Sequence, residues 1–206
     1  MKIRLGSWVF AIVLGISLSA LMCFDSSAQW GGYQRGFGTY QQGYGANAPG
    51  SAGSASPVTY TNTARNFSFT IPAGWEIVSG DPNSDDVVFR KSGASWGFGI
   101  HMTQMLPSFP RKAAVDAGLK QDKERIKINQ VLEARRRDEG NPKKKCSLIG
   151  WEFTEAPQTN GIERIIWQGY DRDNYYINLM AYSSTQDFSA ARTTLREIMD
   201  SIRFCS

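Results

Sequence analysis

The fold is decided by residues 67–78, which read FSFTIPAGWEIV. Apolar and polar residues alternate from Phe67 to Ile71, which is the period of a strand with one buried face. Pro72-Ala73-Gly74 then supplies the residues of a tight turn, and Trp75-Glu76-Ile77-Val78 has the composition of a second strand. This stretch predicts a sheet-containing domain, which we expect to begin near Val58.

The residues that follow predict further strands. They cover residues 87–91, 96–105, 149–153, 162–170 and 175–183. The last two form a hairpin across the polar loop Asp171-Arg172-Asp173-Asn174. In the strand 96–105, alternation places four apolar side chains on one face: Trp96, Phe98, Ile100 and Met102.

Two helices are expected. The first runs from Arg111 to about Arg125, after Pro107 and Pro110 end the preceding strand. The second runs from about Ser189 to Ile202, with Asp187 as its N-cap. Its buried stripe consists of Ala191, Leu195, Ile198 and Ile202.

The segment 126–137 between these elements allows two interpretations. Ile128, Val131 and Leu132 suit a continued helix, whereas the family resemblance described below favours a strand. Strands that are interrupted by one helix and closed by another imply an α+β fold. We therefore expect a single antiparallel sheet with helices packed against it.

A resemblance to a known family rests on four features of this region. They are Phe69-Thr70-Ile71-Pro72-Ala73-Gly74-Trp75, Gly150 at the opening of a strand, the late hairpin, and a helix that ends in Ser201-Ile202-Arg203-Phe204. Over roughly residues 60–204 the chain resembles the PsbP-like family, whose fold is shared with a nuclear Ran-binding protein family. The resemblance implies an α/β/α sandwich and a non-enzymatic extrinsic or assembly-associated role, and it supplies no active site.

The first 28 residues read as a cleavable secretory signal peptide. Lys2 and Arg4 precede an apolar run from Trp8 to Met22, and Ser26-Ser27-Ala28 offers small residues for a peptidase that cuts after Ala28. We therefore expect a secreted or periplasmic protein. Two alternatives stay open, namely an uncleaved membrane anchor and lipidation at Cys23.

Residues 29–57 form a tail rich in Gly, Gln and Tyr, in which Arg35 is the only charged residue. Such a segment cannot bury enough surface to offset its ordering entropy, so we predict a disordered region. It serves either as a linker or, through Trp30, Tyr33, Phe37, Tyr40 and Tyr44, as a weakly self-associating segment of a surface or matrix protein. The folded domain then spans residues 58–206.

Signal removal leaves two cysteines, Cys146 and Cys205. In an oxidising compartment an even pair favours a disulfide bond, and two buried free thiols are the alternative. We expect the bond because the pair flanks the late strands and the terminal helix.

Basic residues concentrate between Arg111 and Lys145, which hold 12 of the 23 Lys and Arg residues against six acidic residues. Without Lys2, Arg4 and Asp25, the 23 basic and 19 acidic residues become 21 and 18, so the mature chain is only mildly basic. A clustered basic loop attracts anionic surfaces. We expect an unknown protein or an anionic envelope component as the partner, no nucleic acid, and no transmembrane segment in the mature chain. The residues predicted to bind it are Arg135, Arg136, Arg137, Lys143, Lys144 and Lys145.

No catalytic, cofactor or metal site is predicted. His101 is the sole histidine, and no GxSxG motif accompanies it. Asp81, Asp85 and Asp86 do not have the spacing of a defined calcium loop. The expected function is an exported, non-catalytic binding or assembly module of the cell envelope. A small extracytoplasmic hydrolase that uses His101 is the alternative from another class.

Overall fold

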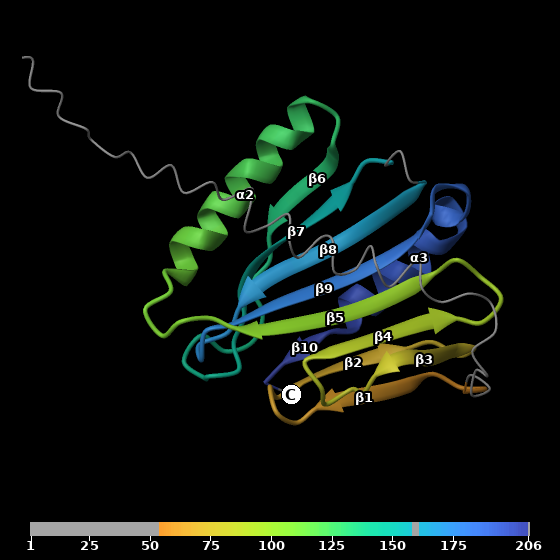
Figure 1. Ribbon diagram of the computed structural model, residues 1–206, viewed down its shortest axis with the longest axis horizontal. Coiled ribbons are helices and arrows are strands. Elements are labelled where there is room, and N and C mark those ends of the chain that lie inside the picture. Colours follow the sequence, from red (N-terminus) through yellow and green to blue (C-terminus); the bar gives the residue numbers. More distant parts are fainter. Residues whose placement is uncertain (1–53, 158–160, 206) are drawn as a thin grey trace, which may run out of the picture. The chain divides into compact units, whose positions relative to one another are not determined.

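The computed structural model describes residues 54–157 and 161–205, so the predicted signal peptide and most of the predicted tail lie outside the described residues. Figure 1 shows the arrangement of the strands and helices in the described part. The strands are β1 (Val58–Asn62), β2 (Phe67–Ile71), β3 (Trp75–Gly80), β4 (Asp86–Lys91), β5 (Gly97–Gln104), β6 (Val131–Arg136), β7 (Ile149–Glu155), β8 (Ile162–Tyr170), β9 (Tyr175–Ser184) and β10 (Arg203–Phe204). The helices are α2 (Arg111–Lys127) and α3 (Thr185–Ser201).

The strands form two sheets, so the expected α+β class is correct but the expectation of a single sheet is wrong. The larger sheet has the order β3-β4-β5-β9-β8-β7-β6 and the smaller has the order β1-β2-β10. All paired neighbours are antiparallel. The turn at 72–74, with Gly74 at a φ of 78°, does not close a hairpin but leads the chain from one sheet to the other.

The second sheet exists because β2 stacks on the larger sheet instead of joining its edge. Phe69 lies 5.6 Å, between ring centroids, from both Phe89 of β4 and Phe98 of β5. Helix α3 covers the neighbouring strands β8 and β9 on the same face (Figure 1). The core therefore lies between the larger sheet on one side and the smaller sheet with α3 on the other.

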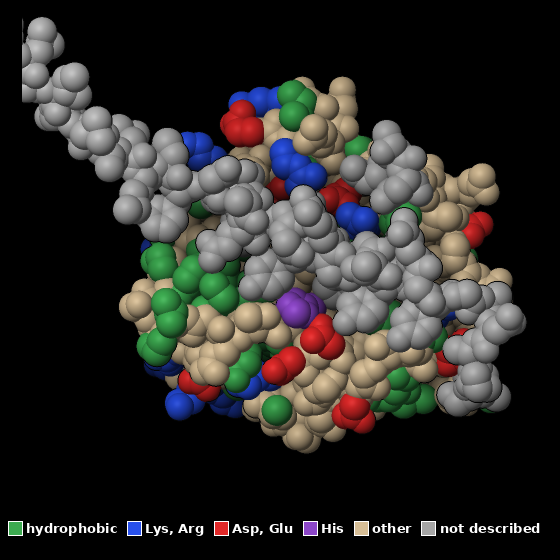
Figure 2. Space-filling model, viewed as in Figure 1, with side chains coloured by type: hydrophobic (Ala, Val, Ile, Leu, Met, Phe, Trp, Pro, Cys, Tyr) green, Lys and Arg blue, Asp and Glu red, His purple; other side chains and the backbone are tan. Residues whose placement is uncertain are grey.

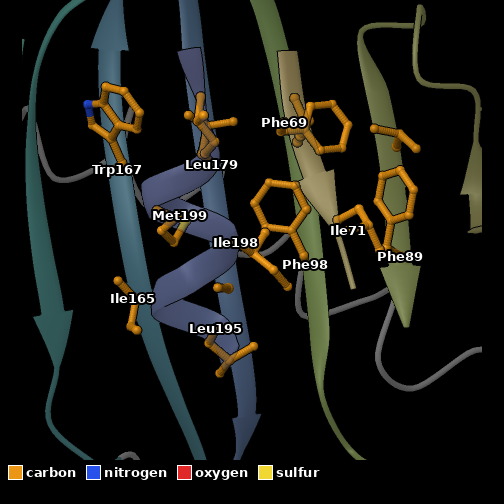
Figure 3. Packing of buried hydrophobic residues seen from close by; sticks show 14 of the residues in the cluster. Phe69, Ile71, Phe89, Phe98, Ile165, Trp167, Leu179, Leu195, Ile198 and Met199 are labelled. Carbon is orange, nitrogen blue, oxygen red and sulfur yellow. The ribbon is translucent and has the colours of Figure 1, made fainter. Parts of the chain in front are cut away.

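All four residues predicted for the core stripe of α3 are buried, although the fourth lies just beyond the helix. Ala191, Leu195 and Ile198 are buried within the helix, and Figure 3 shows Leu195 and Ile198 among the side chains of the larger sheet. Ile202 is also buried, but it is the C-cap residue. The burial of such a stripe stabilises the helix more than its intrinsic propensity does.

The start of α3 corrects the predicted N-cap. Ser184, not Asp187, is the N-cap residue, and its hydroxyl accepts a hydrogen bond from the backbone N of Asp187 at 3.3 Å. Asp187 lies in the first turn, where a carboxylate interacts favourably with the helix dipole. Its Oδ2 accepts from the Ser95 hydroxyl at 2.6 Å.

The ambiguous segment 126–137 contains a helix end and a strand. Helix α2 ends at Lys127, and β6 begins at Val131. Asn129 has a φ of 55°, a left-handed conformation that asparagine tolerates better than most residues and that interrupts the helix. The strand expected from the family resemblance is therefore present from Val131 to Arg136.

Helix α2 packs on β6 and β7, and its interface is partly polar. Gly118 faces Trp151, and a Cβ at this position would lie 2.5 Å from the indole ring, so no larger residue fits. The Trp151 indole N–H donates to the buried Asp122 carboxylate at 2.8 Å. Burial raises the pKa of Asp122, although the hydrogen bonds from Trp151 and Arg125 lower it in part.

Candidate functional site

Cys146 and Cys205 form the predicted disulfide, with their Cα atoms 5.3 Å apart. The bond joins the loop between β6 and β7 to the residue after β10. Gly140 lies in the same loop with a φ of 80°, and a Cβ there would lie 3.2 Å from the Phe204 Cβ. The base of this loop is therefore held close to the C-terminal end of the described chain.

Lys143, Lys144 and Lys145 are exposed at the tip of this loop. A turn that begins at Asn141 shapes the tip, because the backbone N of Lys144 donates to the Asn141 carbonyl at 2.8 Å. Lys145 Nζ lies 3.6 Å from Asp173. Across residues 54–157 and 161–205, no carboxylate lies within ion-pair distance of Lys143 or Lys144. These two ammonium groups are available to an external anion.

The β8–β9 turn, Asp171 to Asn174, adds a fourth exposed cation beside the lysines. Arg172 Nη1 donates to the carbonyl of Lys143 at 2.8 Å, and the Arg172 backbone N donates to that of Lys145 at 3.2 Å. Asp171 is buried and shapes the turn by accepting from the backbone N atoms of Asp173 and Tyr175, at 2.9 and 2.8 Å. Burial raises the pKa of Asp171, although these two hydrogen bonds lower it in part.

The same turn also holds the loop between β5 and α2. Asn174 Nδ2 donates to the carbonyls of Leu106 and Pro107, at 3.0 and 2.7 Å, and the backbone N of Met105 donates to Asn174. The side chain of Leu106 is 75% exposed. Three loops are thus linked at one end of the larger sheet, at the left in Figure 1, where Figure 2 shows basic side chains next to hydrophobic ones. We call Lys143, Lys144, Lys145 and Arg172 the basic loop end.

The arginine triplet is not part of this exposed set. Arg136 binds Asp116 of α2 and Asp138, both at 2.8 Å. Arg135 is 60% exposed and lies 3.0 Å from the Glu152 carboxylate. Arg137 is only 12% exposed and also binds Glu152. The structure therefore separates the two predicted basic triplets into an ion-paired one and an exposed one.

Glu152 of β7 is the centre of an arginine cluster beneath α3. Its side chain is 2% exposed and pairs with Arg135, Arg137 and Arg196. Arg137 also donates to the Met199 carbonyl at 2.7 Å, and its guanidinium lies 3.9 Å from the centroid of the Trp167 ring. Burial alone would raise the pKa of Glu152, but the hydrogen bond and charge of Arg137, with the charges of Arg196 and Arg135, hold it below its ordinary value. This arrangement ties β6, β7 and α3 together.

His101 lies in a line of three polar side chains on the other face of the larger sheet. Its Nδ1 lies 2.5 Å from Asp86 Oδ1, and its Nε2 lies 3.0 Å from the Thr103 hydroxyl. The pairing of Asp86 with His101 across β4 and β5 brings the first two together. Thr103 is two residues along the same strand and therefore faces the same side. The imidazole of His101 therefore lies between a carboxylate and a hydroxyl, which is the arrangement of an acid, a base and a nucleophile in a catalytic triad.

The acidic loop before β4 uses its oxygens within the protein. Asp81 Oδ1 accepts from the backbone N of Asn83 at 2.8 Å, and Asn83 Oδ1 accepts from the backbone N of Thr63 at 2.9 Å. Asp86 is directed to His101. Within the part of the chain that the structure describes, no group of three or more His, Cys, Asp or Glu residues is placed to hold a metal ion.

Sequence analysis missed three of these residues. Glu152 alternates with Trp151 and Phe153, so the sequence places it on the opposite face of the strand, where a carboxylate is expected to be exposed. Its burial depends on Arg196 of α3, which no local pattern reports. Arg172 was seen only as part of a polar turn. Leu106 lies between the predicted strand 96–105 and Pro107 and was given no role, because nothing in its sequence neighbours distinguishes an exposed leucine from a buried one.

No family model matches this chain, and no curated protein matches it. No helix of the described residues combines the length and the apolar character that crossing a membrane requires. Among solved structures, the chain matches the solution structure of cyanobacterial PsbP from Synechocystis sp. PCC 6803, with 15% identity over 77% of this chain and 98% of that chain and a TM-score of 0.48. The matched structure carries the name of the family that the sequence resembles.

Proposed function

We propose that this protein is an exported, non-catalytic binding module that attaches to an anionic component of the cell envelope through the basic loop end. The observation that carries the proposal is the exposure of Lys143 and Lys144 without an ion-pair partner in the described chain. Arg172 adds a cation at the same place. Cations that are not neutralised internally attract an anionic partner at long range.

The way in which the lysine loop is built supports the same proposal. The disulfide and the contacts of Arg172 hold the loop backbone, so the cations are presented without ordering a long flexible segment. A preformed surface loses less entropy on binding. Arg137 is excluded from the binding surface because its charge is committed to Glu152.

A resin that carries dextran sulfate provides the test, with the exported protein eluted by a salt gradient. Replacing Lys143, Lys144 and Lys145 by Gln is expected to lower the salt concentration needed for elution and to weaken binding severalfold. The matched control replaces Lys120, Lys123 and Lys127 by Gln, which removes three exposed charges from α2. Equal effects of the two variants would show that only net charge matters and would overturn the proposal.

Export is part of this proposal and is supported by two features. The first is the signal-like pattern of residues 1–28, and the second is the disulfide, which persists in oxidising compartments. We expect the mature protein to begin at Gln29. Intact-mass measurement of the exported product tests this, and a mass that retains residues 1–28 or a lipid on Cys23 would contradict it.

A second candidate function follows from the line of Asp86, His101 and Thr103. In a hydrolase, His101 would take the proton of the Thr103 hydroxyl while Asp86 orients the imidazole. A fluorophosphonate probe tests this candidate by labelling the nucleophile. Labelling that is lost in both Thr103→Val and His101→Ala would favour a hydrolase over the leading proposal, and an unlabelled wild-type protein would remove the candidate.

A further inference from the structure

We propose that the partner of the basic loop end is the surface of an anionic lipid bilayer, with Leu106 inserted below the headgroups. This inference rests on the proposed function and specifies the partner. Its starting point is Leu106, which is 75% exposed and is the most exposed large hydrophobic side chain of the described residues. A single exposed leucine is common on protein surfaces. Only the residues around it can indicate whether it belongs to a binding surface.

The surroundings of Leu106 are cationic. Lys112, in the first turn of α2, is exposed six positions later in the chain. Asn174 ties the backbone of Leu106 to the turn that carries Arg172, and Arg172 in turn contacts the backbone of Lys143. The acidic residues of the three linked loops are the buried Asp171, the exposed Asp173, which pairs with Lys145, Asp138, which pairs with Arg136, and the half-buried Glu139. The end therefore presents an apolar side chain within an excess of positive charge.

The other exposed hydrophobic side chains lack this charge. Ile128 and Leu132 are 62% and 50% exposed and lie at the opposite end of α2. The nearby Lys127 is paired with Glu124 at 2.6 Å, and Arg135 is paired with Glu152. Charge complementarity to anionic lipid is therefore specific to the end that carries Leu106.

The combination fits a bilayer better than a soluble polyanion. Lysine stems reach the headgroup level while their ammonium groups stay hydrated. Each basic residue near an anionic membrane strengthens binding by about fivefold, and insertion of an apolar side chain adds a contribution that salt does not screen. A sulfated polymer or an acidic protein surface in water gives no comparable gain to a leucine side chain.

The geometry also favours insertion without rearrangement. The Leu106 loop is held by its backbone carbonyls, which accept from Asn174, and not by packing of the leucine side chain. The side chain of Leu106 can therefore enter the apolar region of a bilayer while the backbone of the loop stays in place. The disulfide holds the lysine loop on the other side of the same turn.

Sedimentation with vesicles tests the inference on the exported protein. We expect binding to vesicles of phosphatidylglycerol and phosphatidylcholine and little binding to phosphatidylcholine alone. Leu106→Ser should weaken binding to the anionic vesicles about tenfold and leave binding to dextran sulfate unchanged. Ile128→Ser, which removes a 62% exposed apolar group at the other end of α2, is the matched control and should change neither binding to the anionic vesicles nor binding to dextran sulfate.

The outcomes separate this inference from the proposed function. If the protein binds dextran sulfate but not anionic vesicles, or if Leu106→Ser binds these vesicles as tightly as the wild type, the bilayer is not the partner while the proposed function stands. If Leu106→Ser weakens binding to both probes equally, the loop acts through its structure and the inference is overturned. If the wild type binds neither probe, both the inference and the proposed function fail.

Discussion

Two triplets of basic residues, Arg135 to Arg137 and Lys143 to Lys145, lie in the same part of the sequence but have opposite environments. The arginines lie on or next to a strand, so alternate side chains face opposite sides of the sheet. Arg135 and Arg137 reach Glu152, and Arg136 reaches Asp116 on α2. The lysines lie on a loop tip and face solvent. The backbone conformation, and not the charge pattern, decides which triplet is available to a partner.

The chemistry of the two side chains matches these environments. A guanidinium group is planar and donates several hydrogen bonds in a fixed geometry, which suits a shared buried carboxylate. An ammonium group on a flexible stem is strongly hydrated and suits an exposed position. This contrast implies that the loss in the free energy of unfolding decreases from removal of the disulfide, through removal of Arg137, to removal of the lysines.

The largest effect is expected from the bond that anchors the lysine loop. Replacing both Cys146 and Cys205 by Ser removes a crosslink between residues 59 positions apart. The chain-entropy model gives a loss of roughly 4 kcal/mol for a loop of this length. Urea unfolding measures it, and trypsin should cut after Lys143 to Lys145 sooner in the variant than in the wild type. A loss below about 1 kcal/mol would show that the domain contacts alone hold the loop.

Arg137→Gln is expected to cost about 3 kcal/mol, because it leaves the buried Glu152 without its best-buried partner. The control is Arg135→Gln, which removes a 60% exposed side chain from the same carboxylate and should cost at most about 1 kcal/mol. Both are measured by urea unfolding. Similar losses in the two variants would show that burial does not distinguish the members of the triplet.

The contribution of ionised Glu152 should also appear in the pH dependence of the free energy of unfolding. Because its pKa is held below the ordinary value of 4.5, its ionised form stabilises the fold above that pH, and the contribution is lost as the pH falls through the folded pKa. Burial raises the pKa of Asp122 and Asp171, so their contributions have the opposite sign. As the pH falls below 4.5, we expect the free energy of unfolding to decrease less in Glu152→Gln than in the wild type. Parallel curves would contradict the pKa shift.

Much of the fold could be predicted from the sequence because several elements have a regular local pattern. The alternation from Phe67 to Ile71 and the stripe of α3 are local patterns, and both are present in the structure. The partition into two sheets could not be predicted, because strand pairing depends on contacts between residues far apart in the chain. Thus β10 pairs with β2 although more than a hundred residues separate them.

The candidate site was predictable only in part for the same reason. The lysines were identified as an exposed basic loop, and the cysteine pair was predicted from the expected compartment. The arginines were assigned to the same surface because sequence cannot show that Glu152 and Arg196 meet them. The contribution of Leu106 depends on Asn174, a residue 68 positions away, and no local pattern reports that contact.

The smallest effect on stability is expected from Lys143, Lys144 and Lys145 replaced together by Gln. Surface substitutions of this kind change stability by about 0.5 kcal/mol or less, and only Lys145 forms an ion pair within the described chain. Removing three adjacent like charges relieves their mutual repulsion. The free energy of unfolding should therefore rise slightly at low salt. The difference should become smaller near physiological ionic strength, where the Debye length is about 8 Å. Urea unfolding at both salt concentrations measures this, and a loss of stability above about 1 kcal/mol would mean that the lysines, like the arginines, hold the fold.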